Sequence, residues 1–113
     1  MTGPEQHRRF ARRPILVEFR VRDADDVAGG EIVFDAVDLS EGGAFLRSEI
    51  LLERGDRIEI SFTLPNPAIT IHARARVAWV THRDDAKGEP GMGLEFLDLR
   101  DDERRAITAW RDG

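Results

Sequence analysis

The longest alternating stretch of the chain runs from Ile69 to Trp79 and reads ITIHARARVAW. Apolar side chains stand at every second position, and Thr, His and Arg fill most of the positions between them. Successive side chains of a β-strand point to opposite faces, so a period of two predicts a half-buried strand. The alternation puts Trp79 on the buried face, and we expect its indole in the core. The polar face, which includes His72, is expected to be solvated.

Five further stretches have the alternation or the composition of short strands. Gly-rich and Pro-rich turns such as Pro65-Asn66-Pro67 separate them. Gly93 stands inside the last stretch, where a glycine permits a bulge or a close approach of another backbone. The expected strands run from about 14 to 22, 31 to 39, 44 to 47, 58 to 64 and 91 to 97.

The end of the chain has a helical pattern. Acidic residues cluster from Asp98 to Glu103, and negative charge is favourable at a helix N-terminus. Ile107 and Trp110 then share one side at helical spacing, so we expect a helix over about 101–112 that Trp110 fixes to the barrel. Short strands followed by one helix predict a mainly β fold, an antiparallel sandwich or barrel capped by that helix.

The composition is that of one small globular domain. The chain has 113 residues, of which 41% are hydrophobic and 35% charged, and its formal net charge is −5. That acidity argues against bulk binding to nucleic acid, which calls for a basic domain. The absence of cysteine excludes disulfides and thiolate metal sites. The N-terminus lacks the apolar core of a signal peptide and no stretch is long enough to span a membrane, so we expect a cytoplasmic protein without membrane contact.

The sequence contains no motif typical of catalysis. Its three histidines are far apart and have no metal-ligand spacing. Ser40 lacks the Gly-x-Ser-x-Gly surroundings of a nucleophile, and no phosphate-binding loop of the Walker type is present. We therefore predict that the chain is not an enzyme and has neither a catalytic residue, a metal site nor a cofactor.

Four arginines gather in the stretch His7 to Arg13, which reads HRRFARR. One interpretation is a solvated basic arm that pairs weakly with surface acids. The other is a clamp for an anion or a purine, because guanidinium groups bind phosphate with two hydrogen bonds and stack on bases. Arg8 and Arg12, or Arg9 and Arg13, are four residues apart and could converge on one ligand.

A second polar segment, Asp38 to Gly43, reads DLSEGG and lies between two apolar stretches. It could be a simple Asx- or Ser-supported turn in which Gly43 supplies a positive φ or a close approach. Alternatively, Asp38 and Ser40 point outward from the sheet. There the carboxylate could accept from a guanine N–H and the hydroxyl could reach a phosphate, while Gly43 leaves room for a ligand to lie flat.

Taken together, Arg8-x-x-x-Arg12 and Asp38-x-Ser40-x-x-Gly43 resemble the two-part signature of PilZ domains, which are bacterial receptors for cyclic di-GMP. The resemblance extends over about residues 8–110. Further segments that are similar to the family are GGAFL at 42–46, the Gly55 turn, VAWV at 77–80 and GMGLEF at 91–96. The wording of these segments is closest to a single-domain subgroup found in myxobacteria and related deltaproteobacteria.

The resemblance implies a fold and a set of ligand-binding residues. The implied fold is a six-stranded antiparallel β-barrel with a C-terminal helix, which would occupy 14–113 behind a flexible arm at 1–13. The register that pairs Arg8 with Arg12 is preferred, because the following Phe10 and Pro14 then match the usual wording. The implied binding residues for cyclic di-GMP are Arg8, Arg9, Arg12, Asp38, Ser40 and Gly43.

The resemblance also implies a function, namely a cyclic di-GMP receptor or adaptor. The ligand would order the arginine arm against the strand that bears Asp38 and Ser40, and the new surface would pass the signal to an unidentified effector protein, for example in motility regulation. A monomer or a weak dimer is expected. The alternative is a degenerate PilZ-like adaptor that binds a protein without nucleotide. Binding of single-stranded nucleic acid is disfavoured by the net charge and by the lack of interleaved exposed aromatic residues.

Overall fold

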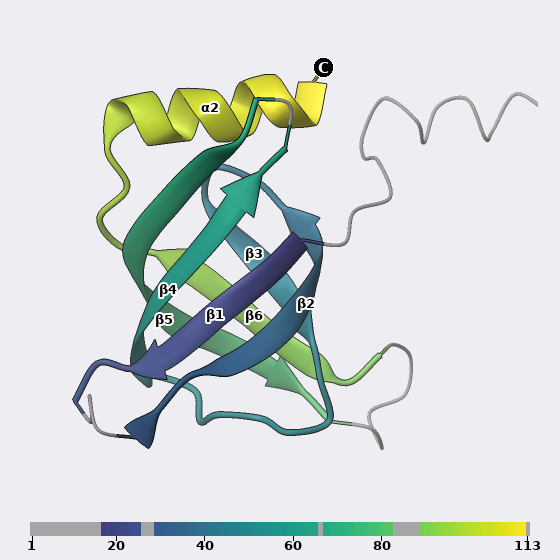
Figure 1. Ribbon diagram of the computed structural model, residues 1–113. Coiled ribbons are helices and arrows are strands. Elements are labelled where there is room, and N and C mark those ends of the chain that lie inside the picture. Colours follow the sequence, from purple (N-terminus) through teal and green to yellow (C-terminus); the bar gives the residue numbers. More distant parts are fainter. Residues whose placement is uncertain (1–16, 26–28, 66, 83–88, 113) are drawn as a thin grey trace, which may run out of the picture.

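The computed structural model describes residues 17–25, 29–65, 67–82 and 89–112. Six antiparallel strands close into a barrel, and one helix lies across an end of it (Figure 1). The mainly β, six-stranded barrel with a C-terminal helix is therefore confirmed. The strands are β1 Val17–Asp23, β2 Ile32–Leu39, β3 Gly43–Arg47, β4 Arg57–Leu64, β5 Ile69–Thr81 and β6 Gly91–Phe96, and the helix is α2 Asp101–Asp112. The predicted arm at 1–13 and its arginines lie outside the described residues.

The strands follow each other around the barrel in the order β1-β2-β3-β6-β5-β4, and β1 pairs with β4 to close it. Apolar side chains from alternate positions of all six strands fill the interior. Phe19 stacks on Phe62 with 4.2 Å between ring centroids, and Phe96 lies 6.1 Å from Phe62. Burial of one large apolar side chain stabilises the fold by about 1.5–3 kcal/mol, so this interior is the main source of stability.

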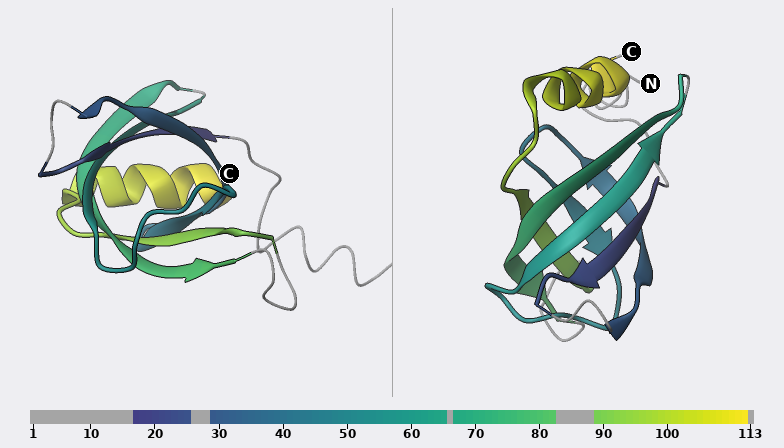
Figure 2. Two further views of the ribbon diagram at one scale, coloured as in Figure 1. Left: turned by 90° about the horizontal axis from the view of Figure 1, so that it is seen from below. Right: turned by 60° about the vertical axis from the view of Figure 1, so that its left-hand side comes forward.

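Helix α2 covers one mouth of the barrel (Figure 2). Its first turn carries Asp101, Asp102 and Glu103, as the predicted N-terminus requires. The Glu103 carboxylate accepts a hydrogen bond of 3.0 Å from the Arg100 backbone N–H, which is half of a capping box. Ile107 is fully buried and Trp110 packs against the core, so the helix is held as predicted.

Strand β5 follows the predicted alternation up to Val77, and then the alternation reverses. Ile71, Ala75 and Val77 are fully buried, but Trp79 is 49% exposed. The prediction of a core indole was therefore wrong. The register with β6 shifts between Val77 and Trp79, so one extra residue is accommodated there as a β-bulge. After the bulge the even-numbered Val80 packs against the core instead.

Strand β2 contains a second register shift, between Ala36 and Asp38 in its pairing with β3. Ala36 is buried before the shift and Leu39 is buried after it. The inward positions thus change from even to odd numbers, and Asp38 is exposed on the outside of the barrel. Both bulges act on the same side of the molecule, because β3 and β6 are the strands between β2 and β5.

Within the described residues, no helix has the length and apolar character to cross a membrane.

Candidate ligand-binding site

The β2–β3 turn is held closed by its own serine. The Ser40 backbone N–H donates to the Gly43 carbonyl over 2.9 Å, and the Gly42 N–H donates to the Ser40 hydroxyl over 3.3 Å. The same hydroxyl is 3.5 Å from the Gly43 carbonyl oxygen. The two contacts of the hydroxyl are long and thus weak, so Ser40 supports the turn and keeps capacity for a further hydrogen bond.

Gly43 is required by the barrel itself. A Cβ at this position would collide with the backbone carbonyl of Leu94 on β6, so only glycine permits this pairing of β3 with β6. Its φ is not in the left-handed region, unlike that of Gly55, where φ is 94°. Of the two structural roles considered for Gly43, the close approach is therefore the one that the structure uses.

Asp38 stands on the outer face directly beside an aromatic pair. The register aligns Asp38 with Phe45, Phe45 with Gly93, and Gly93 with Trp79, in one row across β2, β3, β6 and β5. The Phe45 and Trp79 rings are stacked, with 5.3 Å between centroids and 20° between planes. We call these four residues the Asp38–Trp79 row. A carboxylate beside a flat aromatic surface suits a planar ligand that carries N–H donors.

Gly93 makes the row possible, because a Cβ there would overlap the indole of Trp79. The sequence suggested a bulge or a close approach of another backbone at Gly93, but the group that approaches it is the side chain of Trp79. Trp79 and Phe45 were not among the predicted site residues. A glycine inside an alternating strand was the available indication that a ring lies over that strand, but the sequence did not say which ring.

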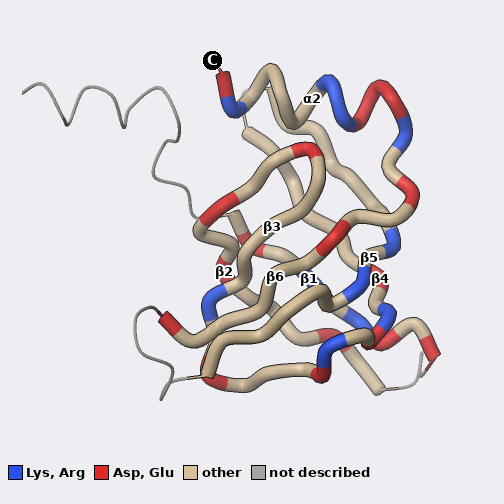
Figure 3. The backbone as a smooth tube through the Cα atoms, turned by 180° about the vertical axis from the view of Figure 1, so that it is seen from behind, with Lys and Arg blue, Asp and Glu red and all other residues tan. Residues whose placement is uncertain are grey.

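The charges around this row are unequally paired. Arg76 donates to Glu95 over 2.6 Å and 3.1 Å, and Arg111 lies 3.2 Å from Glu41 in the turn. Asp38, by contrast, has no hydrogen-bond or ion-pair partner among the residues that the structure describes. On this side of the barrel, acidic and basic residues are interspersed (Figure 3). A cation for Asp38 or for an anionic ligand would therefore come from elsewhere.

The structure brings Asp38, Ser40 and Gly43 together at one end of β2 and β3, in agreement with their spacing. Arg8, Arg9 and Arg12 lie outside the described residues, so their position relative to Asp38 remains a prediction. His72 is exposed on the outer face of β5, as expected. Among the described residues, no group of three or more His, Asp or Glu side chains is placed to hold a metal ion.

The chain belongs to the PilZ domain family, whose model matches residues 6–112. The match covers both polar segments of the sequence. PilZ domains are receptor and adaptor domains, so a binding role at the level of the family follows. No curated protein matches the chain.

Among solved structures, the chain is similar to the Bacillus subtilis inhibitor of motility, MotI/DgrA. The TM-score is 0.71 over 88% of this chain, at 16% sequence identity. At that identity the likeness concerns the fold. The chain corresponds to 46% of the length of MotI/DgrA, about half of that protein. The likeness to the myxobacterial subgroup stays a prediction.

Proposed function

We propose that the chain is a receptor for cyclic di-GMP and that it passes the ligand signal to an effector protein. Membership of the PilZ family supports the ligand class. The observation that carries the proposal is the Asp38–Trp79 row, in which a carboxylate without an ion-pair partner among the described residues lies beside a stacked aromatic pair, with the Ser40 turn following Asp38 in the chain. These groups match a guanine base that is attached to a phosphate.

Each group in the row has a distinct part in the proposed complex. The Asp38 carboxylate accepts hydrogen bonds from guanine N–H groups, and no ion pair between Asp38 and a described residue has to break first. The exposed face of Trp79 offers a stacking surface for a base, and such stacking contributes about 1–3 kcal/mol. The Ser40 hydroxyl lies in the turn that follows Asp38, two residues along the chain, and in the proposed complex it binds a phosphate oxygen.

The arginine segment supplies the positive charge in this proposal. Arg8, Arg9 and Arg12 would bind the two phosphates and stack on guanine, because guanidinium combines a planar face with paired donors. The bound ligand then joins the arginine segment to β2 and β3 and forms a surface that is absent without it. An effector protein would recognise that surface. The name of MotI/DgrA, an inhibitor of motility, makes a motility component a reasonable first candidate.

The alternative function is a protein adaptor that does not bind nucleotide. It is favoured by the structural roles of the second motif, since Ser40 closes its own turn and Gly43 is required for the β3–β6 pairing. These residues would be retained in a barrel of this kind even without a ligand. The two functions therefore differ in their dependence on Asp38, whose carboxylate has no hydrogen bond or ion pair with a described residue.

Isothermal titration with cyclic di-GMP tests the proposal. We expect saturable binding that Arg8→Ala and Asp38→Asn weaken strongly. Asp35→Asn is the matched control, because Asp35 is also an exposed carboxylate of β2 and likewise has no ion pair among the described residues. A wild-type protein that releases no heat with cyclic di-GMP, but still co-purifies with a protein partner, would establish the adaptor instead.

A further inference from the structure

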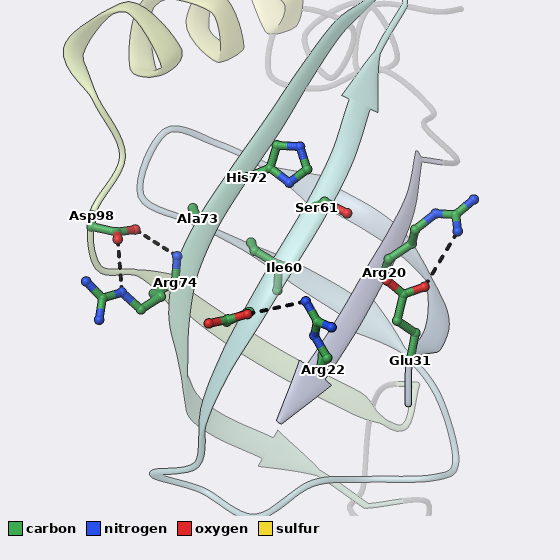
Figure 4. Close-up of a pocket in the computed structure, with 10 residues that line it drawn as sticks. Arg20, Arg22, Glu31, Ile60, Ser61, His72, Ala73, Arg74 and Asp98 are labelled. Carbon is green, nitrogen blue, oxygen red and sulfur yellow. Dashed lines mark hydrogen bonds and ion pairs between the residues drawn. The ribbon is translucent and has the colours of Figure 1, made fainter. Parts of the chain in front are cut away.

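A hollow of about 370 Å³ lies on the outer face of β1, β4 and β5 (Figure 4). It is separate from the Asp38–Trp79 row, although β5 contributes to both. His72 in the hollow and Trp79 in the row are seven residues apart, which corresponds to about 23 Å of strand. The residues that line the hollow are Arg20, Arg22, Glu31, Glu59, Ile60, Ser61, His72, Ala73, Arg74 and Asp98.

The charged side chains of the hollow form two rows across the strands. In one row, Arg22 lies opposite Glu59 in the strand register, and Glu59 lies opposite Arg74, so the charges alternate. In the other row, Arg20 lies opposite Ser61 and Ser61 lies opposite His72, and this row contains no carboxylate. Directly opposite side chains on neighbouring strands are about 4.5–5.5 Å apart at Cβ. An anion that rests on the small Ser61 side chain is therefore within reach of cationic or donor groups on both sides.

The ion pairs on β1 hold their arginines only loosely. The distances from Arg20 to Glu31 and from Arg22 to Glu59 are both 3.6 Å, too long for good hydrogen bonds. All four side chains are more than 40% exposed, and such pairs contribute at most about 1 kcal/mol. Neither guanidinium group donates a hydrogen bond to a described residue. An oxyanion can thus recruit these guanidinium groups at little cost.

Arg74 is fixed more firmly than the other two arginines. The Asp98 carboxylate accepts from the Arg74 backbone N–H over 2.7 Å and from Nε over 3.1 Å. The backbone hydrogen bond from Arg74 is the main cause that lowers the pKa of Asp98, so this carboxylate stays ionised near neutral pH. The contact uses Nε and leaves the two terminal nitrogens of Arg74 for a ligand.

The balance of charges restricts the class of ligand. Three arginines face three carboxylates in the lining, so their charges cancel and a bare anion gains little from the whole site. Glu31 and Glu59 are acceptors that suit hydroxyl or amino groups, whereas Arg20, Ser61 and His72 offer donors. The volume is at the lower end of the 300–1,000 Å³ range of small-molecule sites.

We propose that this hollow binds a small phosphorylated molecule that also carries hydroxyl or amino donors, such as a sugar phosphate. The phosphoryl group lies over Ser61 between Arg20 and His72. The hydroxyl groups face Glu59 and Glu31. In Figure 4 the ion pairs of Arg22 and Arg74 lie below His72 and Ser61, and the pair of Arg20 with Glu31 lies beside Ser61, so the two halves of such a ligand meet different sets of side chains. This site does not depend on the proposed cyclic di-GMP site.

Ribose 5-phosphate is the probe for the first experiment, which follows the backbone amides of the full chain by ¹H–¹⁵N NMR. We expect saturable shifts of the Arg20, Ser61 and His72 amides at concentrations on the order of 1 mM. Ribose alone and inorganic phosphate alone, at matched ionic strength, should bind at least about tenfold more weakly. Equal binding of phosphate and ribose 5-phosphate would overturn the assignment of Glu59 and Glu31 as ligand acceptors.

Three variants test the position of the site. Arg20→Ala and Ser61→Val should each weaken ribose 5-phosphate at least about tenfold, through a lost donor and a filled hollow. Arg57→Ala is the matched control, because Arg57 is an exposed arginine of β4 outside the hollow, and it should bind as the wild type does. If Arg57→Ala lost as much affinity for ribose 5-phosphate, the loss would be explained by the change in net charge, and the proposed site would be wrong.

Asp38→Asn separates this proposal from the previous one. The variant should bind ribose 5-phosphate as the wild type does, even though its affinity for cyclic di-GMP is expected to fall. Loss of ribose 5-phosphate binding in Asp38→Asn would mean that the probe occupies the Asp38–Trp79 row, and the proposed hollow site would be wrong.

Discussion

The two candidate sites on the outer faces of the barrel differ in whether their carboxylates have an arginine partner. In the hollow over β1, β4 and β5, each of the three carboxylates has an arginine within 3.6 Å, namely Glu31, Glu59 and Asp98. On β2, Asp38 has no such partner among the described residues and lies beside stacked aromatic rings. A face whose charges are mutually paired is stable without a ligand and suits a ligand of mixed character. A face with a carboxylate that lacks such a partner can accept hydrogen bonds from the donors of a ligand.

Gly43→Ala should have the largest effect, because it disturbs the backbone that carries the second face. The added Cβ collides with the Leu94 carbonyl, so β3 and β6 must separate. We expect a loss of about 3 kcal/mol in the free energy of unfolding, measured by urea denaturation. Gly42→Ala is the control, because a Cβ at Gly42 meets only the Ser40 hydroxyl at 4.0 Å. A stable Gly43→Ala protein would contradict the close pairing.

Asp38→Asn tests the unpaired carboxylate directly. It should reduce the affinity for cyclic di-GMP about 10- to 100-fold, because a hydrogen bond to a charged group contributes about 1.5–3 kcal/mol. Thermal stability should change little, because the Asp38 carboxylate has no hydrogen bond or ion pair with a described residue that the substitution would remove. Titration calorimetry and a melting curve measure the two quantities. A large drop in the melting temperature would instead assign Asp38 a structural role.

Trp79→Ala tests the aromatic part of the row. The affinity for cyclic di-GMP should fall by about 1–3 kcal/mol, the usual contribution of stacking on a base. Trp79→Phe should restore most of it, because phenylalanine keeps a flat ring over Gly93. If both variants bind as the wild type does, the rings only cover the barrel and do not contact the ligand.

Asp98→Asn should have the smallest effect and it tests the paired face. The pKa of Asp98 is lowered in the folded state, first by the backbone N–H of Arg74, so its ionised form stabilises the fold. That contribution is complete above the ordinary pKa of about 4 and is lost as the pH falls through the lowered folded value. We expect a difference from wild type of at most about 1 kcal/mol at pH 7, since the pair is exposed, and a smaller difference near pH 3. A difference that grows at low pH would contradict this sign.

The strands could be predicted from the sequence because alternation is a local property. The alternating apolar residues indicated where the strands of the barrel lie, and the cluster of acidic residues indicated where the helix begins. The exposure of Trp79 could not be predicted in the same way. It depends on a bulge between Val77 and Trp79, which is a shift in the register between β5 and β6 and aligns Trp79 with Gly93. A register between distant segments is not contained in the alternation of one segment.

For the candidate site, the spacing of the motif indicated that Asp38 and Ser40 lie close together, and the structure has Asp38 near the end of β2 and Ser40 in the turn that follows. The motif did not indicate that the two side chains differ in their hydrogen bonds. The hydroxyl of Ser40 has hydrogen bonds inside its own turn, whereas the carboxylate of Asp38 has no hydrogen bond or ion pair with the described residues. Only the three-dimensional arrangement separates a residue that supports the turn from one that is available to a ligand.

The closure of the barrel limits how an effector can attach. Every strand has a hydrogen-bonded neighbour on both sides. A partner therefore cannot extend the sheet by β-augmentation, which requires an open edge with unpaired backbone groups. Recognition would instead use side chains on the walls of the barrel or on helix α2, or the proposed surface that the bound ligand forms with the arginine segment. Selectivity between effectors would then change by surface substitution alone, without any change to the scaffold.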